Sequence, residues 1–97
     1  MVKYICLFKL HNPADADAVA EKLHTMEGRI AGLLSMETGK NIWDNEARCY
    51  DLALTIVFSR MEAMLAYDND PLHLECREFI YPKRADGKTV VYEIGCD

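Results

Sequence analysis

The chain has 97 residues, of which 51% are hydrophobic and 28% are charged, and its formal net charge is -5. This length predicts a single globular domain over residues 1–97. The acidic balance argues against a nucleic-acid partner, because such a surface needs clustered Lys and Arg. No apolar stretch approaches the roughly 20 residues of a membrane-spanning helix, so we expect no membrane association.

The N-terminus and the cysteines favour a cytoplasmic protein. "MVKYICLFKL" contains a short apolar run, but no small-residue cleavage site follows it, so we interpret it as a strand of the mature protein. The four cysteines, Cys6, Cys49, Cys76 and Cys96, are widely spread and form no C-x-x-C pair. They are therefore predicted to be reduced thiols rather than a zinc or redox motif. The histidines show no ligand spacing either, and no metal is expected.

A strand and a helix are predicted at the start of the chain. Residues 2–10 are rich in β-branched and aromatic side chains, and both faces of this strand are largely apolar. Residues 11–28 then carry a helix-start signature: Asn12 is a capping residue and Pro13 suits the first helical position. Gly28 is predicted to stop this helix.

Two further strands and another helix start follow. Residues 31–43 are predicted to form a strand bent near Gly39, and residues 50–58 a strand that is again apolar on both faces. Ser59 and Glu62 have the spacing of a capping box, which predicts that a helix opens at this serine.

The pair Asp70-Pro71 predicts a break, after which another helix begins. Pro82 is expected to end that helix, and "DGK" at residues 86–88 is expected to form a turn before a last strand at 89–94. "YPKRADGK" is interpreted as a solvated loop. The apolar stripe of the helix after Pro71 consists of Leu72, Cys76, Phe79 and Ile80.

This order, β-α-β-β-α-β, is the ferredoxin-like α+β pattern, in which helices cover one face of an antiparallel sheet. The strands at 2–10 and 50–58 are nevertheless apolar on both faces, so the second face needs a partner. The simplest partner is a second copy of the chain. We therefore predict a homodimer whose sheets face each other and close a dimeric α/β barrel, with Ile5 and Leu7 in the dimer core.

Four stretches resemble the stress-responsive dimeric α/β-barrel (Dabb) family. They are "VKYICLFKL", "GLLSMETGKNI", "YDLALTIVFSRMEAMLAYDNDPLHLECREFI" and "VVYEI", and they follow one another along nearly the whole chain. The block around the second helix is the most specific, with an aromatic residue before an x-P-x-H turn. The resemblance implies a ferredoxin-like protomer and a homodimeric barrel.

The resemblance also implies a site. In plant polyketide cyclases of this family, which work without a cofactor, the histidine of the x-P-x-H turn acts as general base and a preceding tyrosine assists. These positions correspond to His73 and Tyr67. Two positions depart from the pattern: Tyr4 stands where those enzymes have a second histidine, and Asp70 stands before the proline.

The same resemblance implies that Tyr4, Cys6 and Phe8 point towards the helices, where they would bind substrate beside His73. Two interpretations of His73 remain open. Asp70 either contacts the imidazole and orients an acid/base, or it caps the helix while His73 packs beside it.

Three functions are consistent with these patterns. The first is binding or conversion of a small enolisable carbonyl compound without a cofactor, with His73 as acid/base. The second is a cofactor-free monooxygenase-like enzyme, and the third is a non-enzymatic, stress-responsive structural dimer.

Overall fold

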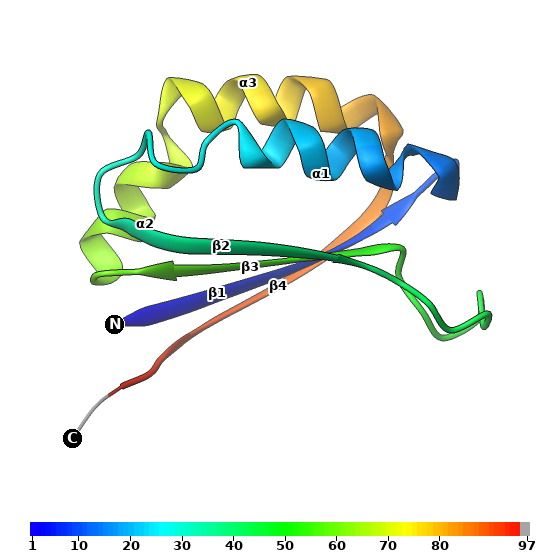
Figure 1. Ribbon diagram of the computed structural model, residues 1–97, viewed down its shortest axis with the longest axis horizontal. Helices are drawn as coiled ribbons and strands as arrows, with labels where there is room; N and C mark the ends of the chain where they lie inside the picture. The colour runs from blue at the N-terminus through cyan, green and yellow to red at the C-terminus, as the bar shows by residue number, and fades with distance from the viewer. Residues whose placement is uncertain (96–97) are drawn as a thin grey trace.

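The computed structural model, which describes residues 1–95, is a four-stranded antiparallel sheet with helices layered on one face (Figure 1). The ferredoxin-like α+β prediction is confirmed. None of the described helices is long and apolar enough to cross a membrane. In chain order the elements are β1 (Val2–Leu10), η1 (Pro13–Asp15, a 3-10 turn), α1 (Ala16–His24), β2 (Leu33–Lys40), β3 (Leu52–Phe58), α2 (Met61–Asp68), α3 (Pro71–Ile80), η2 (Tyr81–Lys83, a 3-10 turn) and β4 (Arg84–Glu93).

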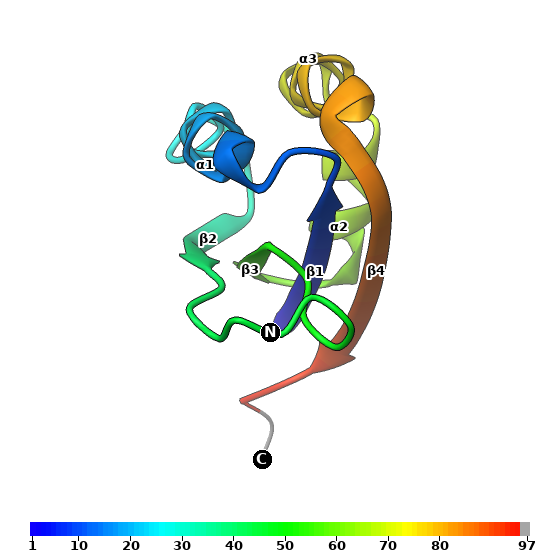
Figure 2. The ribbon, with the colours of Figure 1, turned by 90° about the vertical axis from the view of Figure 1, so that its right-hand side faces the viewer.

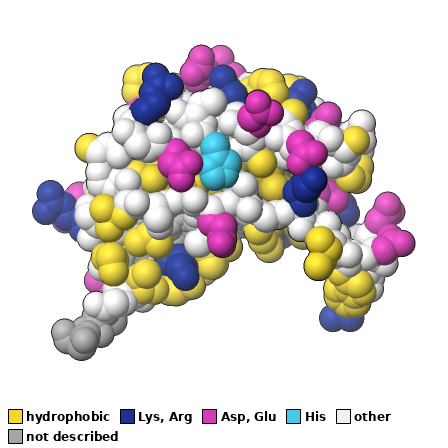
Figure 3. Space-filling view, in the orientation of Figure 1, with side chains coloured by type: hydrophobic (Ala, Val, Ile, Leu, Met, Phe, Trp, Pro, Cys, Tyr) yellow, Lys and Arg dark blue, Asp and Glu magenta, His cyan; other side chains and the backbone are white. Residues whose placement is uncertain are grey.

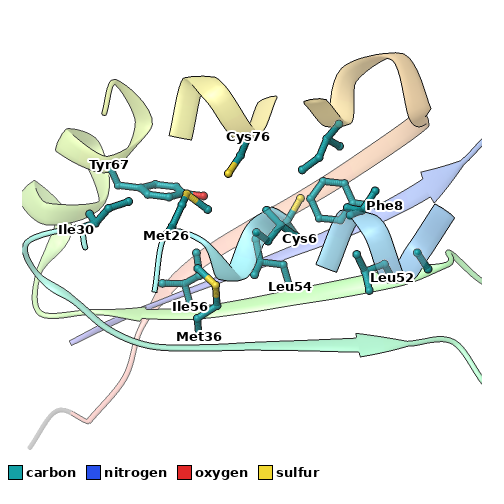
Figure 4. Packing of buried hydrophobic residues seen from close by; sticks show 14 of the residues in the cluster. Cys6, Phe8, Met26, Ile30, Met36, Leu52, Leu54, Ile56, Tyr67 and Cys76 are labelled. Atoms are coloured by element: carbon teal, nitrogen blue, oxygen red, sulfur yellow. The ribbon is translucent and has the colours of Figure 1, made fainter. Parts of the chain in front are cut away.

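The strands are ordered β2-β3-β1-β4, so β1 lies inside the sheet and β4 is an edge strand. Alternate side chains of a strand point to opposite faces, and on the helical face β1 and β3 supply most of the core. Cys6 of β1, for example, lies opposite Leu54 of β3 and Thr89 of β4. The buried core residues of these two strands are Val2, Cys6, Phe8, Leu10, Leu52, Leu54, Ile56 and Phe58 (Figure 4).

The first helical segment begins as the sequence predicts. Asn12 caps it, because its side-chain oxygen accepts a hydrogen bond from the Ala14 N–H at 3.1 Å, and Pro13 occupies the first position. The regular α-helix is shorter than the predicted 11–28 segment, since it ends at His24 and turns follow. Gly28 then takes φ +76°, the left-handed conformation that redirects the chain.

The break at Asp70-Pro71 is also confirmed. α2 ends at Asp68, and α3 begins at Pro71 with Asp70 as its cap. The proline cannot donate a backbone hydrogen bond to the preceding turn, and it restricts the residue before it to extended backbone, which Asp70 adopts with ψ 136°.

Two predictions of local structure are wrong. Ser59 does not cap α2, which begins at Met61 with Arg60 at the cap position, because the Ser59 N–H is bound to the Gly32 carbonyl at 2.8 Å. Residues 86–88 are not a turn, because β4 runs through them. The nine residues of β1 provide a partner along that length, with Gly87 opposite Phe8, and a register shift between Lys9 and Leu10 accommodates the irregular start.

Helices cover only one face of the sheet. α1 lies over β2 and β3, and α3 lies over β1 and β4 (Figure 2). The opposite face is hollowed, and hydrophobic side chains gather along it, whereas charged side chains are scattered over the helical layer (Figure 3). Leu7, Val90 and Tyr92 are 36%, 54% and 43% exposed on this open face.

Candidate functional site

A cavity of about 190 Å³ lies between the helical layer and the sheet. Its walls come from β1, β3 and β4 below and from α1, α2, α3 and η2 above. We call it the His73 cavity. Its lining residues are Tyr4, Cys6, Phe8, Leu23, Leu54, Tyr67, Asp68, His73, Cys76, Arg77, Ile80, Tyr81, Arg84 and Thr89. All five residues that the sequence nominated for the site (His73, Tyr67, Tyr4, Cys6 and Phe8) are therefore brought together in one cavity.

His73 lies in the first turn of α3 and is only 8% exposed. Its Nδ1 lies 3.1 Å from the backbone carbonyl oxygen of Asp68, which can only accept, so Nδ1 carries the proton and donates. Nε2 then holds a lone pair. Nε2 has no hydrogen-bond partner within residues 1–95, and no fully buried side-chain N or O atom there lacks one, so Nε2 is accessible to solvent.

The protonation state of His73 follows from its surroundings. Burial lowers the pKa of His73, because a charged imidazolium loses its hydration, and the hydrogen bond to the Asp68 carbonyl only partly opposes this. The positive charge of Arg77 lowers the same pKa further. At neutral pH the ring is therefore neutral, with a basic nitrogen available.

The choice left open for Asp70 is decided in favour of capping. Its carboxylate accepts a hydrogen bond from the Leu72 N–H at 2.9 Å. The ring of His73 is oriented instead by the backbone carbonyl of Asp68, five residues earlier at the end of α2. The helix break thus has a direct consequence for the site, since it places the last turn of α2 against the first turn of α3.

An aromatic cluster holds the imidazole in place. The ring centroids of Tyr67 and His73 are 4.2 Å apart with planes tilted by 34°. Tyr67 also packs on Phe58 at 5.1 Å and on Tyr4 at 5.9 Å. Such pairs fix ring orientation as well as burying apolar area. Tyr67, which is 2% exposed, therefore positions the histidine ring through packing.

The hydroxyls of Tyr4 and Tyr67 stay protonated at neutral pH. Burial raises the pKa of Tyr4 to about 12, and burial likewise raises the pKa of Tyr67 far above its ordinary value. In the part of the chain that the structure describes, the Tyr67 hydroxyl makes no hydrogen bond. It is therefore a free donor for an oxygen atom in the cavity.

The two thiols of the cavity are not activated. Burial raises the pKa of both Cys6 and Cys76, so neither is a thiolate at neutral pH. Cys76 donates to the Lys22 carbonyl at 3.3 Å, and the Thr89 hydroxyl donates to Cys6 at 3.5 Å. Cys6, Cys49 and Cys76 are free thiols, and Cys96 lies outside the described residues.

Four polar residues that line the cavity were not predicted from the sequence. They are Arg77 of α3, Tyr81 of η2, and Arg84 and Thr89 of β4. The interpretation of "YPKRADGK" as a solvated loop is wrong, because η2 and the start of β4 occupy it. A usable signal did exist: Arg77 follows His73 by four residues, the spacing that puts two side chains on one side of a helix.

Metal ligands are not clustered in the structure. Within residues 1–95, no group of three His, Cys, Asp or Glu side chains lies close enough together to hold a metal ion. His73 can transfer a proton, and the tyrosines and arginines of the cavity can donate hydrogen bonds.

Comparison with known proteins identifies the family. The sequence matches the model of the family described as Stress responsive A/B Barrel Domain over residues 2–95, and the chain therefore belongs to this family. No protein of curated function is similar enough in sequence to count as a relative.

Solved structures with the same fold include both uncharacterised proteins and enzymes. A dimeric ferredoxin-like protein of unknown function from Thermobifida fusca is 23% identical with a TM-score of 0.83, covering 96% of this chain and 90% of that chain. A hydroxynitrile lyase from Passiflora edulis is 14% identical (TM-score 0.81; 97% and 93% covered). SnoaB, a cofactor-independent oxygenase from Streptomyces nogalater, is 13% identical (TM-score 0.78; 99% and 94% covered). At these identities the likeness concerns the fold.

Proposed function

We propose that this member of the stress responsive A/B barrel domain family is a homodimer that binds a small enolisable carbonyl compound in the His73 cavity and transfers a proton without a cofactor. His73 is the general acid/base. The observation that carries the proposal is the orientation of this histidine: its Nδ1 is tied to the Asp68 carbonyl, so the basic Nε2 is left for a ligand.

The proton transfer balances within the cavity. Nε2 of His73 takes a proton from the carbon next to the carbonyl, and the C–H electron pair becomes the C=C bond of an enolate. The carbonyl π electrons move to oxygen, where the protonated Tyr67 hydroxyl donates a hydrogen bond to the new negative charge. The imidazolium then returns its proton to carbon or oxygen, so His73 ends neutral.

The pKa shifts support these roles. A base must be unprotonated at the working pH, and burial lowers the pKa of His73. A hydrogen-bond donor must keep its proton, and burial raises the pKa of Tyr4 and of Tyr67. Tyr4, Cys6 and Phe8 form the β1 wall against which the substrate lies.

The open face of the sheet supports the homodimer. Leu7 of β1 and Val90 and Tyr92 of β4 lie there without helical cover, each more than a third exposed. An apolar patch on neighbouring strands marks an association surface, and a second copy of the same face satisfies it under two-fold symmetry. The Thermobifida fusca protein of the same fold is described as dimeric.

Deuterium exchange tests the catalytic role. The C2 protons of 3-oxobutanamide in D₂O, followed by NMR, should exchange faster with the protein than in buffer. The variant His73→Asn keeps an N–H that can donate to the Asp68 carbonyl but has no basic nitrogen. We expect it to lower the protein-dependent rate by about 100-fold or more.

The matched control is His11→Ala, which removes an exposed histidine that is not among the residues lining the cavity. It should exchange at the wild-type rate. A His73→Asn protein that keeps its rate would exclude His73 as the base. A wild-type protein that gives no exchange above buffer would favour a structural dimer over an enzyme.

A further inference from the structure

We propose that the natural ligand of the His73 cavity is a small organic anion, a carbonyl compound that carries a carboxylate, and that Arg77 and Arg84 bind this carboxylate. The inference rests on the proposed function, because it names the substrate class of the same site. Arg is suited to the task, since its planar guanidinium donates two parallel hydrogen bonds to a carboxylate.

The two arginines reach the cavity from different walls. Arg77 belongs to α3 and Arg84 to β4, the edge strand over which α3 lies (Figure 2). Arg77 follows His73 by one helical turn, and side chains with this spacing are roughly 6 Å apart. A carboxylate at Arg77 therefore leaves the carbon bonded to it within reach of His73. This arrangement fits a 3-oxo carboxylate, whose acidic C2 lies between the carboxylate and the carbonyl.

The positive charge of Arg77 is not neutralised by the protein. On a helix, its ion-pair partners would stand three or four residues away, but those positions hold no acid: they are His73, Leu74, Ile80 and Tyr81. Neither Arg77 nor Arg84 forms a salt bridge to any residue between 1 and 95; the four that occur there join other pairs.

Arg84 has an acidic neighbour two residues on, Asp86, whose pKa the hydrogen bond from Tyr50 and, to a lesser extent, the charge of Arg84 lower; its direct contacts, however, are with other residues. Asp86 accepts a hydrogen bond from the Tyr50 hydroxyl and lies 3.8 Å from Lys88 Nζ. Asp68 is the carboxylate residue among those that line the cavity. The cavity lining carries the two positive charges of Arg77 and Arg84 and the one negative charge of Asp68, and His73 is neutral. The net charge of the lining is therefore positive, although the net charge of the chain is -5.

Gly87 leaves room for the guanidinium of Arg84. A Cβ atom built on Gly87 would come within 2.5 Å of Arg84 Nη1 and 3.4 Å of its Cζ. The φ of Gly87 is not positive, so a side chain here would conflict with the position of the Arg84 guanidinium and not with the backbone conformation. The side chain of Arg84 thus lies directly over this residue of β4, at the wall of the cavity.

The arginines also act electrostatically on the cavity groups. The charge of Arg77 helps to lower the pKa of His73, and the charge of Arg84 opposes the rise that burial causes in the pKa of Cys6. Both charges are therefore felt inside the cavity. Its volume of about 190 Å³ is below the range of drug-sized ligand pockets, so the anion must be small.

Two probes of matched shape test the inference: 3-oxobutanoate, which is an anion, and 3-oxobutanamide, which is neutral. Their dissociation constants are measured by NMR titration at low ionic strength, independently of any turnover. The wild type should bind the anion at least about tenfold more tightly, since hydrogen bonds between charged groups are the stronger ones.

Three variants should reduce this preference. Arg77→Ala and Arg84→Ala should each lower it about tenfold. Gly87→Ala keeps both arginines and displaces the Arg84 guanidinium, so it should lower the preference as well. The matched control is Arg48→Ala, which removes a positive charge from the side chain stacked on Trp43, outside the cavity. It should bind both probes as the wild type does.

The outcomes separate this inference from the proposed function. If the wild type binds both probes equally, or if the arginine variants keep the preference, the anion site is refuted. If His73→Asn also abolishes exchange in that case, the base at His73 stands alone. If instead the arginine variants lose the preference while His73→Asn still exchanges protons, the anion site stands and the base does not.

Discussion

Replacing Tyr67 by Phe separates the chemical role of this residue from its packing. The ring of Tyr67 packs against His73, Phe58 and Tyr4 with centroid distances of 4.2, 5.1 and 5.9 Å. Tyr67→Phe keeps all three contacts and removes only the hydroxyl. The change in the proton-exchange rate therefore measures what the hydroxyl contributes to the reaction. The change in the free energy of unfolding measures any hydrogen bond that the hydroxyl makes within the protein.

We expect Tyr67→Phe to change the free energy of unfolding little and the exchange rate strongly. The Tyr67 hydroxyl has no partner within residues 1–95, so we expect the free energy of unfolding to change by no more than about 0.5 kcal/mol. Removing one donor to a developing oxyanion costs about 100-fold in rate. Tyr67→Ala is the packing reference, because it empties the ring space of a residue that is 2% exposed and should cost about 3 to 5 kcal/mol.

Urea unfolding and exchange of the C2 protons of 3-oxobutanamide measure the two effects on the same samples. A loss of more than about 1 kcal/mol in Tyr67→Phe would mean that the hydroxyl is bonded within the protein, contrary to our reasoning. An unchanged exchange rate would show that this hydroxyl does not stabilise the enolate, and Tyr4 and Tyr81 would then be the remaining tyrosine donors of the cavity.

Three further results are expected. The exchange rate should rise with pH through the pKa of His73, which burial lowers from 6.5, and should level off above it; a rate that falls over this range would exclude a neutral histidine as base. Because the unfolded chain binds this proton more tightly, unfolding free energy should drop as pH falls below about 6.5, until the folded pKa is reached, and His73→Asn should remove that part of the slope. Leu7→Asp on the open face should convert the dimer into a monomer of 11.1 kDa in light scattering, while Leu74→Asp on α3 should not; a monomeric wild type would contradict the proposed homodimer.

The features that could be predicted from the sequence depend on neighbours along the chain. The Asn12 cap, the Pro71 break and the strand at residues 2–10 each need only a few adjacent residues, and the structure confirms all three. The position of His73 in the first turn of α3 follows from the break alone. The family pattern then nominated Tyr67 as its companion, and the two rings do stack.

Strand length escaped prediction for a different reason. "DGK" has the composition of a turn, but the backbone groups of β1 that lie opposite residues 86–88 need hydrogen-bond partners. Pairing with β1 therefore extends β4 through Gly87. A capping box at Ser59 fails similarly, because the Gly32 carbonyl binds the Ser59 N–H from a segment far away in sequence. In both cases a backbone partner elsewhere in the chain outweighs the local preference.

The order of elements, the helix break and the residue types available for proton transfer can be read from the chain, because they follow from side-chain pattern and local backbone preference. How these residues are used depends on contacts between distant segments. The atom that orients His73 is the backbone carbonyl of Asp68, which no residue type reveals. Arg77 and Arg84 line the same cavity because α3 packs over β4, and the Arg84 guanidinium lies where a side chain at residue 87 would stand.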